Sequence, residues 1–532
     1  MSFTTLHFFL FLAMGVLIYY LLPKKLQWVW LLVLSYLYYF TFSIKTSVFL
    51  IFTTVVTYTG GILLTRMNES SKAYLAANKE TLDRAAKKAY KEKVKKNKRR
   101  VVVAMLLLCF GLLGVVKYLN FVIENIDALV LAVGHGQYFE PVNIILPLGI
   151  SFYTFQSISY IIDVYQGKYS AEKNLFKYAL FVSFFPQLLQ GPIGRFDRLA
   201  HQLYEGRSFS LKAAEFGLQR ILWGCFKKMV LADRVAGFVT TVFGNYTEYG
   251  GWYNLVAVLL YCVQLYADFS GGIDITRGVA RMFGIDMAEN FRRPIFAMSL
   301  TEYWRRWHIT LGAWMRDYVF YPLSLSKTFG KLSRWARTHI KGTGGKIFAT
   351  SLATFIVYLI IGIWHGANFR YIAFGLWNGV LITASLLLER TFLRWKSALH
   401  INDKSAAWRV FMTLRTMLLV FIGRYFTRSP RLSCVFRFLK TTVLHPQPSQ
   451  LFDGTLLSFG LAKTDFLVIA LGLAVLLTLE CFQERGVQIR AALEKKSGFV
   501  QWLTVTALLL AVLLLGVFRA GYIPSGFIYT QF

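Results

Sequence analysis

The chain is dominated by apolar runs that are separated by short basic segments. Uncharged runs long enough to cross a hydrocarbon core as a helix of roughly 20 residues recur at about 142–162, 347–364, 371–388 and 500–518. Shorter or lightly interrupted runs lie near 8–22, 27–43, 46–64, 101–116, 175–190, 213–232, 251–267, 410–423 and 466–479. This pattern predicts about 11 to 13 hydrophobic helices, some of which stop short of a full span.

Two polar interruptions indicate that some of these helices are broken or re-entrant. The stretch Leu146–Gln156 is apolar but contains Pro147 and Gly149, followed by several hydroxyl and amide side chains. A second interruption, from Gln187 to Arg195, directly follows an apolar run. Irregular backbone at membrane depth is tolerated where protein or a water-filled cavity surrounds it. A plain kinked helix explains Leu146–Gln156 equally well from its residue types.

Composition and charge placement agree with a membrane protein. Hydrophobic residues make up 56% of the chain and charged residues only 16%, which favours one integral membrane domain over residues 1–532 rather than soluble domains. The first run lacks the basic start and cleavage site of a signal peptide, so we expect a retained helix. The formal net charge of +32 is concentrated in loops.

The charge distribution predicts the topology. Between Arg66 and Arg100 stand 13 Lys or Arg against 4 Asp or Glu, and short loops rich in Lys and Arg stay cytoplasmic. We therefore expect a basic cytoplasmic loop at 66–100, with a surface helix around 72–98, and both chain ends outside, including an extracytoplasmic tail at 519–532. Contacts with anionic lipid head groups then explain the positive charge better than nucleic acid does.

The segment Asn290–Pro322 mixes aromatic and basic residues as interfacial amphipathic helices do. Its aromatic and basic residues include Trp304, Trp307, Trp314, Arg305, Arg306 and Arg316. If this segment is one helix, Trp304 and His308 share a face, whereas Arg305 and Arg306 point elsewhere. An interfacial anchor with an incidental histidine explains the same residues.

Histidine and cysteine define the candidate chemistry. The chain has only 8 His, and an imidazole in or near the bilayer, such as His308 or His365, is a functional-site hypothesis by default. A lone histidine after a helix is also typical of a hydrogen-bonded structural residue. The five cysteines show no metal or redox spacing, so we expect packing roles and no metal site; they are Cys109, Cys225, Cys262, Cys434 and Cys481.

Several stretches together resemble the membrane-bound O-acyltransferase family, specifically its bacterial alginate O-acetyltransferase-type branch. The matching stretches are Leu146–Gln156, Gln190–Arg195, Tyr266–Gly271, Asn290–Pro322 and Gly362–Asn368. Their order and spacing cover about 140–380. The resemblance implies an all-α bundle around a central funnel. It places the family's invariant histidine on His365 and its second, more variable polar position on His308.

This resemblance implies the roles of individual residues in acyl transfer. A neutral imidazole, with an unperturbed pKa of about 6.5, suits His365 as the general base that removes a hydroxyl proton. His308 would support His365 or orient the acyl donor. Trp364 and Asn378 would lie next to the two histidines as supporting residues. We expect no bound cofactor and acetyl-CoA as the donor. Its phosphates would be met by three arginines that are equally suited to an interfacial role: Arg305, Arg306 and Arg316.

The C-terminal sequence Gly526–Phe532 resembles the Phe-Ile-Tyr-Phe-x-Phe ending of polysaccharide-modifying relatives and of a helper peptide in teichoic acid D-alanylation. Thr530 stands where that ending has Phe, and Tyr529 is kept. The resemblance implies that Tyr529 carries the acyl group outside. An aromatic chain end is also typical of a simple interfacial anchor.

Together these features predict a component of the bacterial cytoplasmic membrane that passes an acetyl group outward through His365 and Tyr529. The acceptor would be an extracytoplasmic SGNH-hydrolase-like acetyltransferase with a Ser-His-Asp site, which modifies an exopolysaccharide or cell-wall glycan. D-alanyl transfer to teichoic acid is an alternative, although that branch is shorter and keeps its tyrosine tail on a separate peptide. A transporter or flippase is another, but we find no inverted repeat of broken helices.

Overall fold

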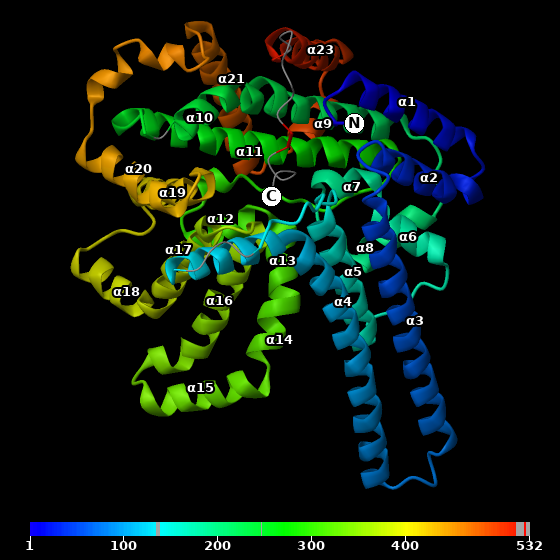
Figure 1. Ribbon diagram of the computed structural model, residues 1–532. Helices are drawn as coiled ribbons and strands as arrows, with labels where there is room; N and C mark the ends of the chain where they lie inside the picture. The colour runs from blue at the N-terminus through cyan, green and yellow to red at the C-terminus, as the bar shows by residue number, and fades with distance from the viewer. Residues whose placement is uncertain (135–138, 246, 518–525, 528–532) are drawn as a thin grey trace. The chain divides into compact units, whose positions relative to one another are not determined.

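The computed structural model describes residues 1–134, 139–245, 247–517 and 526–527 (Figure 1). Throughout these ranges the secondary structure is helical, apart from one isolated antiparallel bridge between Phe291 and Trp307. The prediction of an all-α protein is confirmed. The chain forms two compact units, residues Met1–Glu215 with Val279–Ala288, and residues Phe216–Gly278 with Glu289–Phe532.

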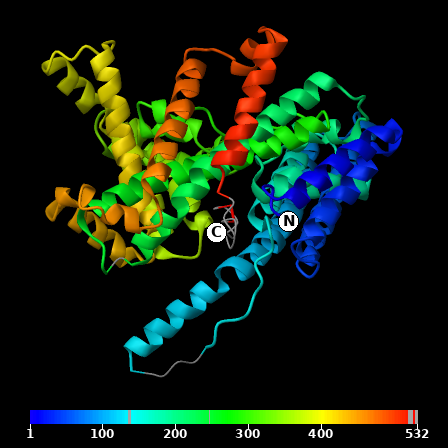
Figure 2. The same ribbon diagram turned by 90° about the horizontal axis from the view of Figure 1, so that it is seen from above.

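The first unit contains the helices of the N-terminal part of the chain. They are α1 (Leu6–Leu21), α2 (Gln27–Phe40), α3 (Ser47–Ala77), α4 (Arg84–Ala132), α5 (Ile150–Gln166), α6 (Leu175–Ser183), α7 (Phe185–Gln190) and α8 (Phe196–Tyr204), with 3-10 turn η1 (Lys24–Leu26). Figure 2 shows the C-terminal end of α4 extending beyond α1, α2 and α3. Two hydrogen bonds of 2.9 Å between Asn120 and the backbone of Val142 tie the returning chain to α4.

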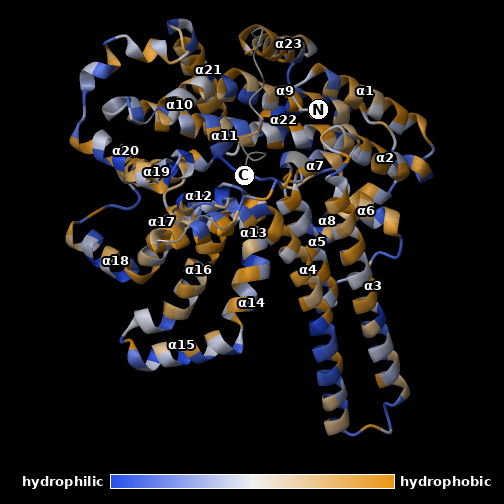
Figure 3. Cartoon of the chain, in the orientation of Figure 1, coloured by the Kyte–Doolittle hydropathy of each residue, from blue (hydrophilic) through white to orange (hydrophobic). Residues whose placement is uncertain are grey.

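The basic loop predicted at 66–100 is built from the ends of two long helices. Helix α3 continues to Ala77, and α4 begins at Arg84, where the Asp83 carboxylate accepts a hydrogen bond from the Ala86 N–H. The surface helix expected around 72–98 is therefore interrupted by a turn. Ala, Lys and Glu are strong helix formers, so the basic sequence extends directly into the apolar part of α4, as the change from blue to orange in Figure 3 shows.

Both predicted interruptions of the helical pattern are confirmed. Helix α5 begins at Ile150, because Gly149 has a left-handed backbone with φ of +70°. Only glycine fits there, since a Cβ would lie 2.3 Å from the Leu188 carbonyl oxygen. Helix α7 ends at Gln190, within the second polar stretch. The two stretches meet where the Gln156 and Gln187 side-chain amides donate to one acceptor, the Phe181 carbonyl oxygen, at 2.6 and 3.0 Å.

The second unit contains the remaining helices. They are α9 (Leu211–Cys225, in this unit from Phe216), the π-helical η2 (Phe226–Ala232), α10 (Asp233–Gly244), α11 (Gly251–Met282, in this unit to Gly278), η3 (Pro294–Phe296), α12 (Leu300–Arg306), α13 (Ile309–Met315), η4 (Arg316–Phe320), α14 (Tyr321–Ser324), α15 (Lys327–His339), α16 (Thr343–His365), α17 (Phe369–Leu387), α18 (Glu389–Ala398), α19 (Ala406–Arg428), α20 (Leu432–Leu444), η5 (Pro448–Leu451), η6 (Thr455–Ser458), α21 (Lys463–Glu484), α22 (Ile489–Glu494) and α23 (Gly498–Leu515).

Eight helices of the described chain are long and apolar enough to cross a membrane: α3, α4, α11, α16, α17, α19, α21 and α23. The other predicted hydrophobic runs form shorter helices, such as α1 with 16 residues and α2 with 14. This division agrees with the expectation that some runs stop short of a full span. The protein is thus a multi-pass membrane protein. The expected central funnel stays a prediction.

Helices α9 and α11 approach each other closely through glycine. A Cβ on Gly224 would lie 2.6 Å from the Gly271 carbonyl oxygen, and one on Gly278 would lie 2.7 Å from the Gly217 carbonyl oxygen. Small residues at such positions allow helix backbones to pack closely within a membrane, where lipid is as apolar as a leucine side chain. The seven-residue spacing on both helices repeats the contact after two helical turns.

Buried and partly buried ion pairs lie next to these glycine contacts. Asp274 on α11 accepts from Arg220 at 2.8 Å and from Lys227 at 2.7 Å. Lys228 in η2 lies between two carboxylates, Asp233 at 2.8 Å and Asp268. Helices α21 and α23, which are orange and red in Figure 2, also contact η2. The π-helical turn, which continues α9 in the chain, therefore contacts α10, α11, α21 and α23.

We expect Gly224→Ala to destabilise the protein. The added methyl group meets the Gly271 carbonyl oxygen and the Ile275 N–H of α11, which cannot move away as the Ile275 side chain could. Overpacking of this kind costs roughly 1–3 kcal/mol. The thermal midpoint of unfolding in detergent should fall clearly below that of the native protein. Gly237→Ala on the adjacent α10 is the matched control, because its new Cβ would meet no atom within 4 Å. Equal midpoints for the two variants would contradict the close approach.

Candidate active site

A short hairpin of backbone carries His308. The Arg292 N–H donates to the Arg306 carbonyl oxygen at 2.8 Å, and the Ile309 N–H donates to the Asn290 carbonyl oxygen at 3.0 Å. Helix α12 ends at Arg306, and His308 has a left-handed backbone with φ of +48° as the N-cap of α13. The prediction that Trp304 and His308 share the face of one helix is therefore wrong. Pairing with residues 290–292 replaces helical hydrogen bonds at this point.

Asn290 determines which nitrogen of His308 carries the proton. Its side-chain Oδ1 accepts from the Thr310 N–H at 3.0 Å and from the Thr310 hydroxyl at 2.9 Å. Because a backbone N–H can only donate, this amide atom must be the oxygen. The same Oδ1 lies 3.2 Å from His308 Nδ1, which must then be the protonated nitrogen. Nε2 consequently holds the lone pair of the neutral ring.

The surroundings of His308 keep its imidazole neutral. Its side chain is 2% exposed, with the Phe269 ring of α11 at 4.9 Å and the Trp364 ring of α16 at 6.0 Å. This burial lowers the pKa of His308 to about 3, because a charged imidazolium would lose its hydration. At neutral pH His308 therefore acts as a hydrogen-bonding group without charge.

His365 is the last residue of α16 and is half-buried. Its ring lies 5.0 Å from Trp364, 5.9 Å from Phe374 and 6.4 Å from Tyr371, measured between ring centroids. Since the Trp364 indole also contacts His308, one tryptophan joins the surroundings of both histidines. The structure thus brings together two residues that are 57 positions apart in the sequence.

Asn378 connects α12 to α17. Its Oδ1 accepts from the Trp304 indole N–H at 3.1 Å, and its Nδ2 donates to the Phe374 carbonyl oxygen at 2.8 Å. Trp304 therefore contacts α17, and its ring also lies 6.0 Å from Tyr358 of α16. The amide connects α12 to the helix that carries Phe374, a neighbour of His365.

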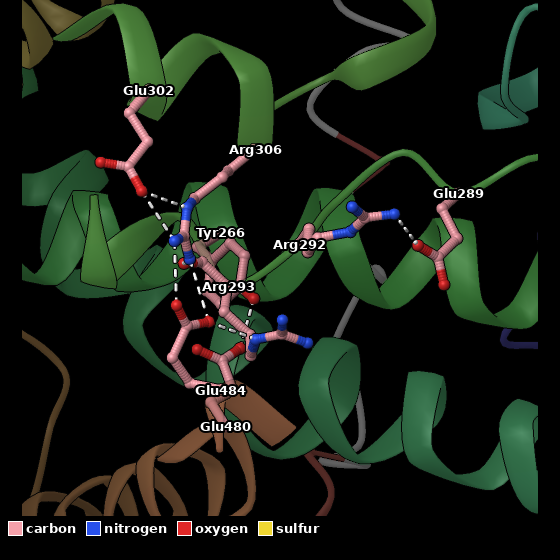
Figure 4. Close-up of polar contacts among 8 residues, drawn as sticks. All are labelled: Tyr266, Glu289, Arg292, Arg293, Glu302, Arg306, Glu480 and Glu484. Carbon is pink, nitrogen blue, oxygen red and sulfur yellow. Dashed lines mark hydrogen bonds and ion pairs between the residues drawn. The ribbon is translucent and has the colours of Figure 1, made fainter. Parts of the chain in front are cut away.

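A group of charged side chains fixes the hairpin to the end of α21 (Figure 4). Arg306 donates to Glu484 at 2.9 and 3.0 Å and to Glu302 at 2.7 Å, and Arg293 donates to Glu484 at 2.6 Å. Burial alone would lower the pKa of the Arg306 guanidinium, but hydrogen bonds with Glu484 and Glu302 raise it. Such bidentate contacts define geometry as well as charge.

The three arginines expected to bind the donor have different surroundings. Arg306 is engaged by two carboxylates, as described above. Arg316 is exposed and pairs with its neighbour Asp317 at 3.0 Å, and Arg305 is also exposed. Arg305 and Arg316 are consequently the more accessible of the three cations.

Arg424 is a buried cation that was not singled out from the sequence. It is 5% exposed, donates to the Tyr303 hydroxyl at 2.7 Å, and lies 4.9 Å from the Trp307 ring and 5.9 Å from the Phe374 ring. Within the described residues it has no carboxylate partner. Aromatic faces stabilise such a cation through their quadrupole. The only sequence signal was an arginine directly after the apolar run 410–423.

Other predicted site features have different outcomes. Tyr529 lies outside the described residues. The stretches Leu146–Gln156 and Gln190–Arg195 belong to the first unit, whereas both candidate histidines belong to the second.

No group of three or more His, Cys, Asp or Glu that could hold a metal occurs among the residues that the structure describes. All five cysteines are free thiols; Cys481 is exposed, whereas Cys109, Cys225 and Cys434 are buried.

Comparison with known proteins identifies the class. The family model of the membrane-bound O-acyltransferase family matches residues 170–422. The probable alginate O-acetylase AlgI of Pseudomonas aeruginosa is 35% identical over 81% of this chain and 72% of its own length. The chain belongs to the membrane-bound O-acyltransferase family.

Two further relatives extend the comparison. The probable alginate O-acetylase AlgI of Pseudomonas syringae is 38% identical over 60% of this chain, and the match covers 56% of that protein. The peptidoglycan O-acetyltransferase of Helicobacter pylori is 29% identical over 65% of each chain. Each of these two matches covers more than half of this chain.

We expect Asn290→Ala to reduce both stability and acyl transfer. The change removes the acceptor of two Thr310 donors and of His308 Nδ1, and each buried group left unpaired costs about 1–3 kcal/mol. The thermal midpoint should fall, and His308 should lose its defined tautomer. Asn402→Ala is the matched control, because Asn402 accepts a backbone N–H at 3.0 Å in an exposed loop, where water can replace it. Similar losses in both variants would contradict this role of Asn290.

Proposed function

We propose that this protein is the membrane component of a polysaccharide O-acetylation system. It takes an acetyl group from acetyl-CoA on the cytoplasmic side and delivers it to an extracytoplasmic acetyltransferase. Membership of an O-acyltransferase family supports this proposal, as do relatives named for alginate and peptidoglycan acetylation. The observation that carries it is that the Trp364 indole contacts the rings of both His308 and His365, at 6.0 and 5.0 Å between ring centroids.

The chemistry assigned to His365 is general base catalysis. The oxygen of an acceptor hydroxyl attacks the thioester carbonyl carbon while the imidazole removes the hydroxyl proton. The carbon–sulfur bond then breaks, the coenzyme A thiolate leaves, and the proton on the imidazole is available to it. This step moves one acetyl group and one proton and needs no other reactant.

His308 is assigned a supporting part in the same step. Its Nδ1 proton is held by Asn290, so that Nε2 offers a lone pair in a fixed direction. Such an acceptor can orient a hydroxyl or an amide of the donor without gaining charge. Arg305 and Arg316, which are exposed, would meet the phosphates of coenzyme A.

The outward route in this proposal ends on the C-terminal tail. Tyr529 would accept the acetyl group on its phenolic oxygen, in a topology with both chain ends outside the bacterial cytoplasmic membrane. An SGNH-hydrolase-like partner with a Ser-His-Asp site would then move it to an exopolysaccharide or cell-wall glycan. The aromatic pattern of the tail and the distribution of Lys and Arg support this arrangement.

We expect His365→Ala to abolish transfer from acetyl-CoA labelled in the acetyl group. Loss of a general base lowers a rate by about 100- to 10,000-fold, whereas the folded fraction, measured by size-exclusion chromatography, should be unchanged. His339→Ala is the matched control, because His339 is an exposed histidine at the end of α15. Full transfer by a folded His365→Ala variant would refute the assignment.

Tyr529→Phe should leave thioester cleavage detectable but remove the label from the tail. The phenyl ring keeps the size of the side chain and lacks the oxygen that would carry the acetyl group. Mass spectrometry of the C-terminal peptide measures this directly, with Tyr522→Phe as the control from the same tail. A labelled tail peptide in Tyr529→Phe would show that another residue is the acceptor.

A further inference from the structure

A buried lysine contacts an aromatic residue near the C-terminus. The Lys228 ammonium nitrogen lies 4.9 Å from the centroid of the Phe527 ring. Both side chains are almost completely buried, at 1% exposed for Lys228 and 2% for Phe527. A phenylalanine that served only as a lipid anchor would turn its ring outward, so the position of this ring needs another explanation.

The charge of Lys228 is fixed in place by two carboxylates. Asp233 at 2.8 Å and Asp268 both pair with the ammonium group, and each is buried. Asp268 comes from α11 and Asp233 from the start of α10. The lysine therefore does not depend on Phe527 for its charge balance, and it presents a fixed cation to the ring face.

The chain is attached to the same region before the tail begins. The Val517 N–H donates to the Met229 carbonyl oxygen at 3.4 Å, and Arg234 donates to the Leu515 carbonyl oxygen. Arg234 also pairs with Asp465 of α21. Residues 228–234 thus contact the chain at two points, Val517 just after α23 and Phe527 in the tail. These two points are ten positions apart in the sequence.

We propose that Lys228 is a docking residue for the C-terminal tail, holding the ring of Phe527 in the second unit. Its consequence for the reaction rests on the proposed relay through Tyr529. Two residues span at most about 7 Å of extended chain, so that docking at Phe527 confines the Cα of Tyr529 to within that distance of the anchor. Lys228 and Phe527 are positioning residues, because neither is the acyl acceptor.

The first test locates Phe527 without using activity. The variant Phe527→p-benzoylphenylalanine is irradiated in purified full-length protein, and the cross-linked peptides are identified by mass spectrometry. The expected product joins the tail to the segment Phe226–Ala232 or to the part of α11 around Asp268. Cross-links confined to other parts of the chain, or to detergent alone, would overturn the proposal.

The second test measures whether the aromatic ring of Phe527 contributes to docking of the tail. Removal of C-terminal residues by carboxypeptidase should be about 2- to 30-fold faster in Phe527→Leu, because a cation–π contact shifts a docking equilibrium by about that factor. Phe527→Tyr keeps the ring and should match the native rate. Phe499→Leu is the control, since Phe499 lies on α23 and is exposed. Equal rates for Phe527→Leu and Phe527→Tyr would refute the role of the lysine.

These experiments separate docking from chemistry. We vary Phe527 rather than Lys228, because removing the ammonium would leave two buried carboxylates unpaired and disturb folding. If Tyr529 carries no label but the cross-link to Phe226–Ala232 forms, docking stands and the relay fails. If the relay operates without that cross-link, the docking site is wrong and the proposed function is unaffected.

Discussion

The close approach of α9 and α11 is the constraint on which the second unit depends. In a membrane, apolar side chains gain little by leaving lipid for one another, so helix association relies on close packing and polar contacts. This interface uses both, with Gly224 against Gly271 and with Asp274 between Arg220 and Lys227. Because these ion pairs form at only one register of the two helices, they fix the position of α11 relative to α9.

The position of α11 in turn determines the surroundings of His308. The Phe269 ring lies against the imidazole, and the Tyr266 hydroxyl bonds to Glu480 of α21. One turn further along α21, Glu484 pairs with Arg306 and Arg293, one from each of the two chain segments that form the hairpin. The Glu484 ion pairs are only partly buried, and ion pairs that remain in contact with solvent add little net stability. We therefore infer that the main effect of these contacts is to orient the hairpin relative to α11, rather than to stabilise the fold.

Features that depend on neighbouring residues could be predicted from the sequence. Features that depend on contacts between segments far apart in the chain could not. Apolar runs located the helices, and Pro147 with Gly149 predicted the break before α5 because the signal lies within a few residues. The hairpin was missed, since pairing between Asn290 and Ile309 overrides the helical pattern of Trp304 to His308. Arg424 was missed for a related reason. Its aromatic partners, Trp307 and Phe374, come from other helices.

The surroundings of the two histidines favour different parts in proton transfer. His308 is enclosed by rings and stands next to Trp307, whose face already meets the Arg424 cation. A second positive charge there would be opposed both by lost hydration and by Coulomb repulsion, so His308 is suited to accepting a hydrogen bond without taking the proton. His365 is half-buried at the end of α16, so its ring is the more accessible and the better hydrated of the two. A base that must carry a proton until the thiolate leaves requires such a position, and this supports the general base assignment for His365.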